Sequence, residues 1–436
     1  MLHGDEVGLT VSNIKAWTPA IRSSIGHTLM AIRIRDLFFF SAPFFFLAAQ
    51  VLKYHNAPWE LLPDSTIGFQ QLGVTGGLVV TFQLVGALLL VSVSLISLSE
   101  HSEEIPVVLK LTIFSFFVIC TIWCVATCAM NGVDSLTYRT GTPLVYLSLV
   151  SISLGFDNDL VRLVGKAVTC LLPIYFVLFG IEFFRIQSTM GWIVIGSSAV
   201  MTYFVTSFWL VAMYIAIAEF TGNANSALVF LCCMFLCVMA VLLRSRSWVI
   251  QSAALLLIYS LASARNALDG LVKAVALVAV VFAALAILIN LFPEYFGALI
   301  DKVGQDNRSE QLQNVFDQIP LETWLIGGGI DAKYYFNGYM TGAIDNQFLY
   351  ICYHWGLLFA VLFFGPLSFA VIKSTMFTLR GHRELLFVSV LLAFWLFALL
   401  GLSIYNTLTF NVQMFFIPLF TGLVYSYIRS NCCMEG

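Results

Sequence analysis

Arginines occur at two places in this chain that could bind an anion: between two apolar runs, where a charge is costly to bury, and in a long polar segment. Arg244 and Arg246 separate two apolar runs in the stretch LLRSRSW (242–248), and Arg308 lies in a long polar segment. A guanidinium matches two phosphate oxygens at once, so these arginines are candidates for binding a phosphate or pyrophosphate. For the pair at 244 and 246 the alternative is a short turn whose arginines extend to a membrane surface.

A second group of candidates opens the stretch GAIDNQFLYICYHWGLL (343–359). Asp345 and Asn346 stand just before an apolar helical segment, and His354 lies about two turns inside it. A carboxylate can act as a general base toward a hydroxyl group, although an aspartate before a helix is also an ordinary cap residue. On a helix His354 falls roughly opposite Asp345, so we expect His354 to be a hydrogen-bonded residue between helices and not part of a catalytic dyad.

Three consecutive glycines, Gly327, Gly328 and Gly329, precede this stretch. GGGIDA matches G-x-G-x-x-A, but no strand–turn–helix unit surrounds it, so the pattern does not indicate a dinucleotide site. The glycines predict a tight backbone turn that lets a substrate or a helix approach closely.

The elements that must position these residues are membrane helices. The chain has 436 residues, 60% hydrophobic and 10% charged, whereas about a quarter of the residues in a soluble domain are charged. Because about 20 apolar residues span the hydrocarbon core as a helix, we predict an all-α polytopic membrane protein. The expected spans, about twelve, are 36–53, 72–98, 105–130, 141–156, 162–182, 191–218, 225–243, 247–264, 270–291, 346–374, 384–403 and 408–428.

The distribution of Lys and Arg predicts the orientation. With the N-terminus inside, most of the 21 basic residues fall on the cytoplasmic side, as the positive-inside rule requires. We therefore expect residues 1–35 and 429–436 to be cytoplasmic and the segment 292–345 to be a long external loop. The net charge of −3 argues against a nucleic-acid partner.

The long loop has a helical pattern of its own. Leu312, Val315, Phe316 and Ile319 follow helical spacing in residues 307–320, and Pro320 ends the segment. This pattern predicts an amphipathic helix that lies against the outer membrane face or over a cavity. No second domain is indicated, so residues 1–436 are expected to form one membrane domain.

Taken in order, these features resemble the superfamily of O-antigen polymerases (Wzy) and O-antigen ligases. The residues that carry the resemblance are FTGNANSALV (220–229), Ser245-Arg246, Arg308 in DNRSEQLQNVFDQ, LIGGGI (325–330), Asp345-Asn346 and Gly356-Leu357. The resemblance implies a GT-C-like membrane glycosyltransferase of the bacterial inner membrane, with a periplasmic active site that acts on glycans linked to undecaprenyl pyrophosphate. A chain-length regulator is a candidate protein partner.

The resemblance implies that Arg246 and Arg308 bind the pyrophosphate. From position and residue type we further expect Arg244 to help them and Asp345 to be the catalytic base that activates or orients an acceptor hydroxyl. Residues expected to position the substrate are Gly327, Gly328, Gly329, Tyr334, Tyr335 and Asn346. The lipid pyrophosphate is itself an activated leaving group, so neither a cofactor nor a metal is expected.

Three functions fit these features to different degrees. In the ligases a histidine occupies the position of Asp345, which favours a polysaccharide polymerase over a ligase that transfers finished polymer to lipid A-core. A transporter or lipid-linked glycan flippase is an alternative of another class, because twelve spans are also common there. Such a protein is expected to carry charges within its spans and to show two related halves, which the sequence does not indicate.

Overall fold

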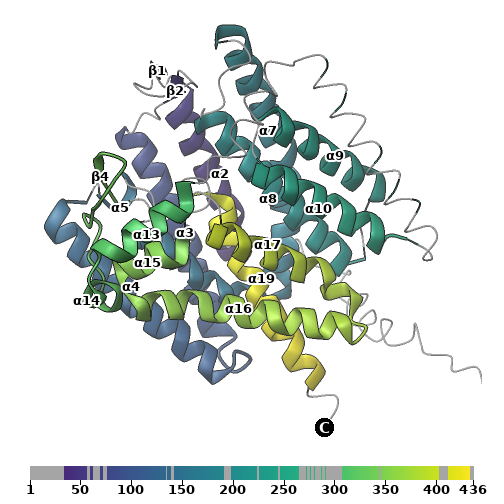
Figure 1. Ribbon diagram of the computed structural model, residues 1–436. Coiled ribbons are helices and arrows are strands. Elements are labelled where there is room, and N and C mark those ends of the chain that lie inside the picture. Colours follow the sequence, from purple (N-terminus) through teal and green to yellow (C-terminus); the bar gives the residue numbers. More distant parts are fainter. Residues whose placement is uncertain are drawn as a thin grey trace, which may run out of the picture.

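Helices make up nearly all of the described structure, and two short hairpins complete it (Figure 1). The computed structural model describes residues 34–55, 59–61, 69–71, 76–133, 135–138, 142–190, 198–222, 225–243, 246–264, 272, 275, 279, 286, 290, 307–342, 344, 346–401 and 411–432. The elements of the first half are α2 (Ile34–Tyr54), β1 (Trp59–Leu61), β2 (Phe69–Gln71), α3 (Gly77–Glu100), α4 (Val107–Asn131), α5 (Ser135–Tyr138), α6 (Pro143–Tyr146), η1 (Leu147–Phe156), α7 (Asn158–Met190) and α8 (Ser198–Phe220). Those of the second half are α9 (Ser226–Leu242), α10 (Arg246–Ala262), α13 (Asn307–Gln318), α14 (Leu321–Ile326), β3 (Tyr334–Phe336), β4 (Tyr339–Thr341), α15 (Gln347–Trp355), α16 (Leu357–Leu379), η4 (Arg383–Leu385), α17 (Leu386–Gly401) and α19 (Val412–Cys432).

The predicted all-α membrane protein is confirmed. Seven helical segments among the described residues are long and apolar enough to cross a membrane, namely Ile34–Tyr54, Gly77–Glu100, Val107–Asn131, Asn158–Arg185, Ala199–Phe220, Leu357–Leu379 and Arg383–Leu400. Three shorter apolar helices, Pro143–Phe156, Ser226–Leu242 and Trp248–Ala262, match further expected spans, and α19 matches the last one in position. The expected span 270–291 lies almost wholly outside the described residues.

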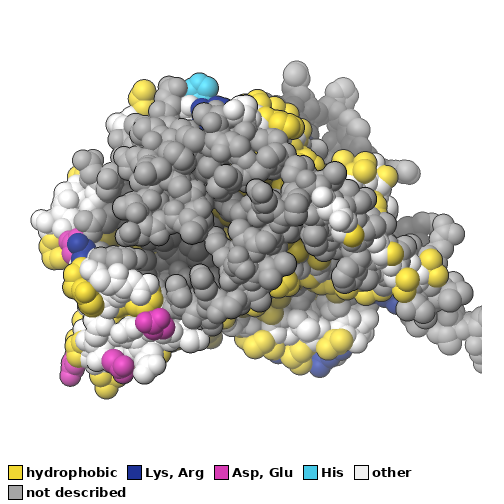
Figure 2. Space-filling model, turned by 45° about the horizontal axis from the view of Figure 1, so that its top comes forward, with side chains coloured by type: hydrophobic (Ala, Val, Ile, Leu, Met, Phe, Trp, Pro, Cys, Tyr) yellow, Lys and Arg dark blue, Asp and Glu magenta, His cyan; other side chains and the backbone are white. Residues whose placement is uncertain are grey.

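Burial separates central from peripheral helices. In the most apolar 18-residue stretch of α8, 83% of the stretch is buried inside the protein. In the corresponding stretch of α4, only 28% is buried. The exposed face of α4 carries Leu111, Phe114, Ile122 and Val125, side chains that suit lipid. Figure 2 shows hydrophobic side chains gathered along the described flanks and few charged ones. This distribution is typical of a bundle with lipid around it.

The bundle is assembled around α19. This helix packs on η1, α16, α17 and α8, while α7 packs on α8 and α9 packs on α10. In Figure 1, α7 to α10 lie on one side of α19, and α3, α4 and α13 to α15 lie on the other. Aromatic pairs lock α2 to α19: Phe39 stacks on Phe416, and Phe46 stacks on Phe415, with ring centroids 5.4 and 5.2 Å apart.

The expected span 141–156 is not a regular α-helix in the structure. After one turn of α-helix, residues Leu147–Phe156 form a 3₁₀-helix that is buried throughout. Runs of 3₁₀-helix longer than three or four residues are uncommon, but small residues here allow close packing. The hydroxyl of Ser153 donates to the carbonyl of Ser94 (2.6 Å), and that of Ser97 donates to the carbonyl of Ser153 (3.1 Å), so α3 holds η1 through its backbone.

The expected single span 346–374 is also different: it is two helices. α15 ends at Trp355 and α16 begins at Leu357, with Gly356 between them at φ 91° and ψ 159°. This backbone conformation is essentially open to glycine alone. The prediction of one continuous helix was wrong because a single glycine inside an apolar run usually remains helical.

The long loop before α15 has the predicted helix and more. α13 spans Asn307–Gln318, and Val315 and Ile319 are buried as expected, whereas Phe316 is exposed and stacks on Trp324 (5.4 Å). α14 and a hairpin of β3 and β4 follow, with Tyr335 paired to Met340 in an antiparallel register. The loop therefore forms a folded layer before α15 begins.

Candidate functional site

The arginines expected to bind pyrophosphate lie at helix starts. Arg246 is the first residue of α10, and Arg308 is the second residue of α13. The N-terminus of a helix attracts anions through its free N–H groups and its dipole. Arg244 and the side chains of Arg246 and Arg308 lie outside the described residues, so their mutual geometry stays a prediction.

The polar pair before α15 is described in part. Asp345 lies outside the described residues. Asn346 caps α15, because its side-chain oxygen accepts a hydrogen bond from the N–H of Leu349 at 3.1 Å. The next residue, Gln347, is buried and donates from Nε2 to the hydroxyl of Tyr146 at 2.8 Å. The start of α15 is thus held by its own cap and by the segment that leads into η1.

The glycine turn caps the other end of α15. The N–H of Gly328 donates to the carbonyl of Tyr353 (2.8 Å), and the N–H of Gly329 donates to the carbonyl of His354 (2.9 Å). The last carbonyls of a helix have no partner within it, and inside a membrane an unpaired carbonyl is expensive. The loop therefore supplies the hydrogen bonds that the break after Trp355 leaves unmade.

Two glycines make this approach possible. A Cβ on Gly327 would stand 2.7 Å from the backbone carbon of Trp355, and a Cβ on Gly356 would stand 2.7 Å from the carbonyl oxygens of Leu325 and Ile326. Backbone packs directly on backbone at this point. The prediction that the glycine turn permits close approach is confirmed, and what approaches is a helix end.

The side chain of His354 makes further hydrogen-bond contacts with the same loop. Its side chain is 2% exposed, with Nδ1 2.7 Å from the carbonyl oxygen of Gly329 and Nε2 2.9 Å from that of Gly342. His354 is hydrogen-bonded as predicted, but these two partners are loop carbonyls and not another helix.

Beside the hairpin lies an open cavity of about 340 Å³. It is lined by residues of α13, α14, the hairpin and α15: Gln318, Ile319, Pro320, Thr323, Gly328, Ala332, Lys333, Tyr334, Tyr335, Met340 and Tyr353. Gln318 fixes the hairpin to α13, because its amide donates to the carbonyl of Tyr335 (2.8 Å) and accepts from its N–H (2.9 Å). The hairpin side of the cavity is thus attached to α13.

The two tyrosines expected to contact substrate have different surroundings. Tyr334 is 2% exposed and packs edge-on against Tyr353 (6.3 Å), whereas Tyr335 is 55% exposed. Successive side chains of a strand point to opposite faces, which explains the difference. Of the two, Tyr335 is exposed enough to contact a ligand, whereas Tyr334 packs the hairpin against Tyr353 of α15.

Sequence reasoning did not single out Gln318, Lys333 or Tyr353, which line this cavity. Their residue types carry no motif, and only the fold of the loop brings them together.

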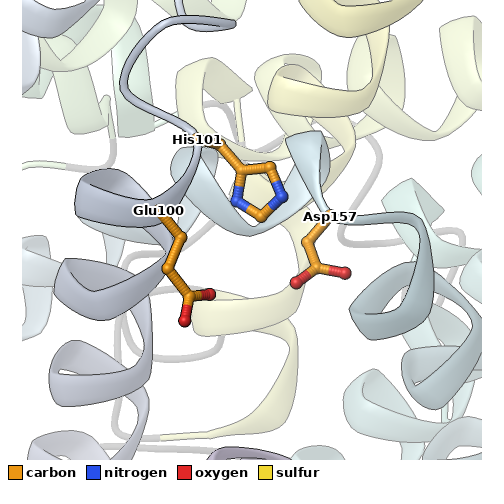
Figure 3. Close-up of side chains that lie close together, drawn as sticks. All are labelled: Glu100, His101 and Asp157. Carbon is orange, nitrogen blue, oxygen red and sulfur yellow. The ribbon is translucent and has the colours of Figure 1, made fainter.

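A cluster at the opposite end of the bundle has metal-ligand residue types. Glu100, His101 and Asp157 bring possible ligand atoms within 4.8 Å of one another (Figure 3). The cation beside them is a guanidinium: Nη1 of Arg35 is 2.5 Å from Glu100 and 2.8 Å from Asp157. A metal ion would compete with this positive charge, so the chemistry of the cluster fits an ion-pair network that joins α2 and α3 to the junction of η1 and α7.

Replacing Arg35 with methionine is expected to destabilise the protein. Asp157 is buried (side chain 8% exposed) and would lose its counter-charge, while Glu100 is half exposed and would be screened by water. Removing one partner of a buried pair costs about 3–5 kcal/mol. Thermal unfolding in detergent should show a marked fall in the midpoint. Arg162→Met is the control, because the pair of Arg162 with Asp159 is exposed (58% and 69%); an equal fall in both variants would contradict the role of burial.

Comparison of the chain with known protein families, with curated proteins and with solved structures found no match.

Proposed function

We propose that the protein is a membrane glycosyltransferase that joins undecaprenyl-pyrophosphate-linked oligosaccharide repeat units into O-antigen or a related surface polysaccharide. The proposal includes a GT-C-like fold of about twelve spans, a place in the bacterial inner membrane, and an active site on the periplasmic face. No cofactor or metal takes part in it.

The observation that carries the proposal is the folded external loop on the broken helix. The backbone N–H groups of Gly328 and Gly329 donate hydrogen bonds to carbonyls of α15, and the ring of His354, in α15, contacts two carbonyls of the loop. These contacts hold the loop on α15. They hold the cavity beside Tyr335 against α15, the helix that follows Asp345 in the sequence. A lipid-linked sugar needs such a place, where polar groups meet the outer ends of membrane helices.

The proposed roles follow from charge and residue type. Arg246 and Arg308, each in the first turn of a helix, bind the donor pyrophosphate with help from Arg244 and stabilise the negative charge that develops as it leaves. Asp345 accepts the proton of the acceptor hydroxyl. Tyr335 stacks on sugar at the wall of the 340 Å³ cavity, which is large enough for a sugar ring and its substituents.

The proposal is tested by complementing a deletion strain with single variants. Arg246→Ala and Arg308→Ala are each expected to abolish long polysaccharide chains on a gel, and Asp345→Asn to reduce polymerisation by about 10²–10⁴-fold, with each protein still present in the membrane. Arg162→Ala, which replaces an exposed arginine near the start of α7, is the control and should leave the ladder unchanged. A normal ladder in both arginine variants would refute pyrophosphate binding by these residues.

The same strain separates polymerase from ligase. Loss of a polymerase leaves a single repeat unit on the lipid A-core, whereas loss of a ligase leaves a bare core. We expect the single repeat unit, and a bare core would assign the chain to the ligases.

Specific features also favour a transporter as a second candidate. The break at Gly356 makes α15 and α16 a discontinuous helix, which is common at transporter binding sites. In addition, Glu182 is buried in α7 and pairs with Arg185 (2.7 Å). Purified protein in detergent distinguishes the two classes: a polymerase lengthens lipid-linked repeats without two compartments, and a flippase does not.

A further inference from the structure

The short helix α14 exposes large apolar side chains. Leu321, Leu325 and Ile326 are 70%, 50% and 72% exposed, and we call these three residues the α14 patch. At about 100° per residue they lie within an arc of about 140° on one side of the helix, and Glu322 is the one charged residue of α14. Single exposed leucines are ordinary on a protein surface, whereas a contiguous apolar patch marks an interaction site.

The α14 patch adjoins the apolar surface of a membrane span. α14 packs on α15 and on α16, close to the start of α16 (Figure 1). A Cβ on Gly356 would stand 2.7 Å from the carbonyl oxygens of Leu325 and Ile326, so the two backbones are in contact there. The next residues, Leu357 and Leu358, are exposed and begin the span of α16. The apolar surface of this span therefore begins where α14 ends.

The neighbouring helix α4 shows at what depth the loop lies. Trp123 of α4 packs edge-on against Trp355, with ring centroids 5.2 Å apart, and a Cβ on Gly329 would stand 3.9 Å from its ring. α4 continues from Trp123 to Asn131, about 12 Å at 1.5 Å per residue. Val125 and Met130 in that part of α4 are apolar and exposed. The glycine turn that ends α14 thus lies level with the apolar surface of the bundle and not beyond it.

The other helix of the loop, α13, has a different surface. Its exposed described side chains are polar apart from Phe316, namely Ser309, Glu310, Gln313, Asp317 and Gln318. Phe316 stacks on Trp324 of α14, and Gln318 lines the cavity beside the hairpin. Of the two positions expected for this amphipathic helix, the one over a cavity fits these contacts. The lipid-like surface of the loop belongs to α14.

We infer that α14 is a membrane anchor, which lies along the bilayer with the α14 patch in contact with lipid at the boundary of headgroups and acyl chains. Interfacial helices bury their apolar face about 5–10 Å into this boundary. Glu322 limits the depth, because a carboxylate is costly in hydrocarbon and stays at the level of the headgroups.

The position of α14 also sets the level of the cavity. Pro320, which precedes α14, and Thr323, which belongs to it, both line the cavity. A cavity at the level of the headgroups takes a ligand whose polar part is carried by a lipid. This consequence deepens the proposed function and rests on it, whereas the contact of α14 with lipid does not.

The inference is tested by electron paramagnetic resonance on the full-length protein in bilayers of phosphatidylethanolamine and phosphatidylglycerol. Stop-codon suppression places a nitroxide amino acid at one position at a time, Leu321, Leu325 or Ile326, and leaves the native cysteines untouched. Power saturation then compares collisions of the nitroxide with oxygen, which concentrates in lipid, and with a water-soluble nickel complex. Gln313, exposed on α13, is the aqueous control, and Ile372, exposed on α16, is the lipid control.

We expect nitroxides at 325 and 326 to collide more often with oxygen than with the nickel complex, as at 372, and the ratio to reverse at 313. A preference for the nickel complex at 325 and 326 would place the α14 patch in water and overturn the inference. Few collisions with either reagent would overturn it too, because a second copy or another part of the chain would then cover the patch. No substrate is present, so this result is independent of complementation, which decides the proposed function.

Discussion

Replacing Gly422 with alanine is expected to prevent α19 from packing closely on η1 and to destabilise the protein strongly. A Cβ at this position would fall on the carbonyl oxygen of Ile152, and a Cβ on Gly155 would fall on the backbone of α19 at Leu419 and Leu423. These contacts are with backbone atoms, which cannot turn aside as a flexible side chain can. Overpacking typically costs about 1–3 kcal/mol and occasionally more. Since relief here requires two buried elements to separate, we expect a cost at the upper end or beyond.

Fluorescence-detected size exclusion and thermal unfolding in mild detergent measure this effect. Gly180→Ala in α7 is the matched control, because a Cβ there meets no atom within 4 Å. Alanine in an exposed helix interior is favoured over glycine by about 0.5–1 kcal/mol, so the control should be unchanged or slightly more stable. A Gly422→Ala protein that elutes and unfolds like the wild type would contradict the close contact of η1 with α19.

This contact matters for the candidate site because η1 is continuous with one of its supports. Tyr146, the residue before η1, accepts the hydrogen bond from Gln347 at the start of α15. Its ring also packs edge-on against Phe359 and Phe363 of α16, each 5.3 Å away. A shift of η1 would therefore displace contacts of both α15 and α16, the two halves of the broken helix. The position of α15 depends on packing deep in the bundle as well as on the loop that precedes it.

The sequence predicted the elements whose signal is local. Long apolar runs predicted the membrane helices, because about 20 apolar residues have no other stable arrangement in lipid. The spacing of Val315 and Ile319 predicted α13, and the run of glycines predicted a turn with close backbone approach. Each of these depends on residues that are near one another in the chain.

Features that depend on distant residues were not predictable in the same way. A glycine inside an apolar run costs a helix only about 1 kcal/mol, so Gly356 alone does not indicate a break. The break becomes favourable because Gly328 and Gly329, more than 20 residues earlier in the sequence, supply the hydrogen bonds that α15 lacks. Likewise, the ion pairs of Arg35 with Glu100 and Asp157 join α2 and α3 to the junction of η1 and α7, and they have no local motif.

Replacing Gly356 with alanine is expected to detach the loop of α13, α14 and the β3–β4 hairpin from α15. Alanine at φ 91° and ψ 159° is strained by about 1–3 kcal/mol. Its Cβ would also stand 2.7 Å from the carbonyl oxygens of Leu325 and Ile326, which adds an overpacking cost of about 1–3 kcal/mol. The strain is relieved if residues 347–379 become one continuous helix, and the carbonyls of Tyr353 and His354 then bond within that helix. Hydrogen bonds from Gly328 and Gly329 would no longer be needed, and the loop would lose its attachment.

Hydrogen exchange read by mass spectrometry distinguishes this outcome from general unfolding. In Gly356→Ala the amides of 321–342 should exchange much faster, while those of α16 remain protected and polymer formation is lost. Gly365→Ala, nine residues further along α16, is the matched control, since a Cβ there meets no atom within 4 Å. If Gly356→Ala left exchange in 321–342 unchanged, the glycine contact would not be what holds the loop. If exchange rose but polymer still formed, the docked loop would not be part of the active site. Exchange reports how the loop is attached, and polymer formation reports what the loop does.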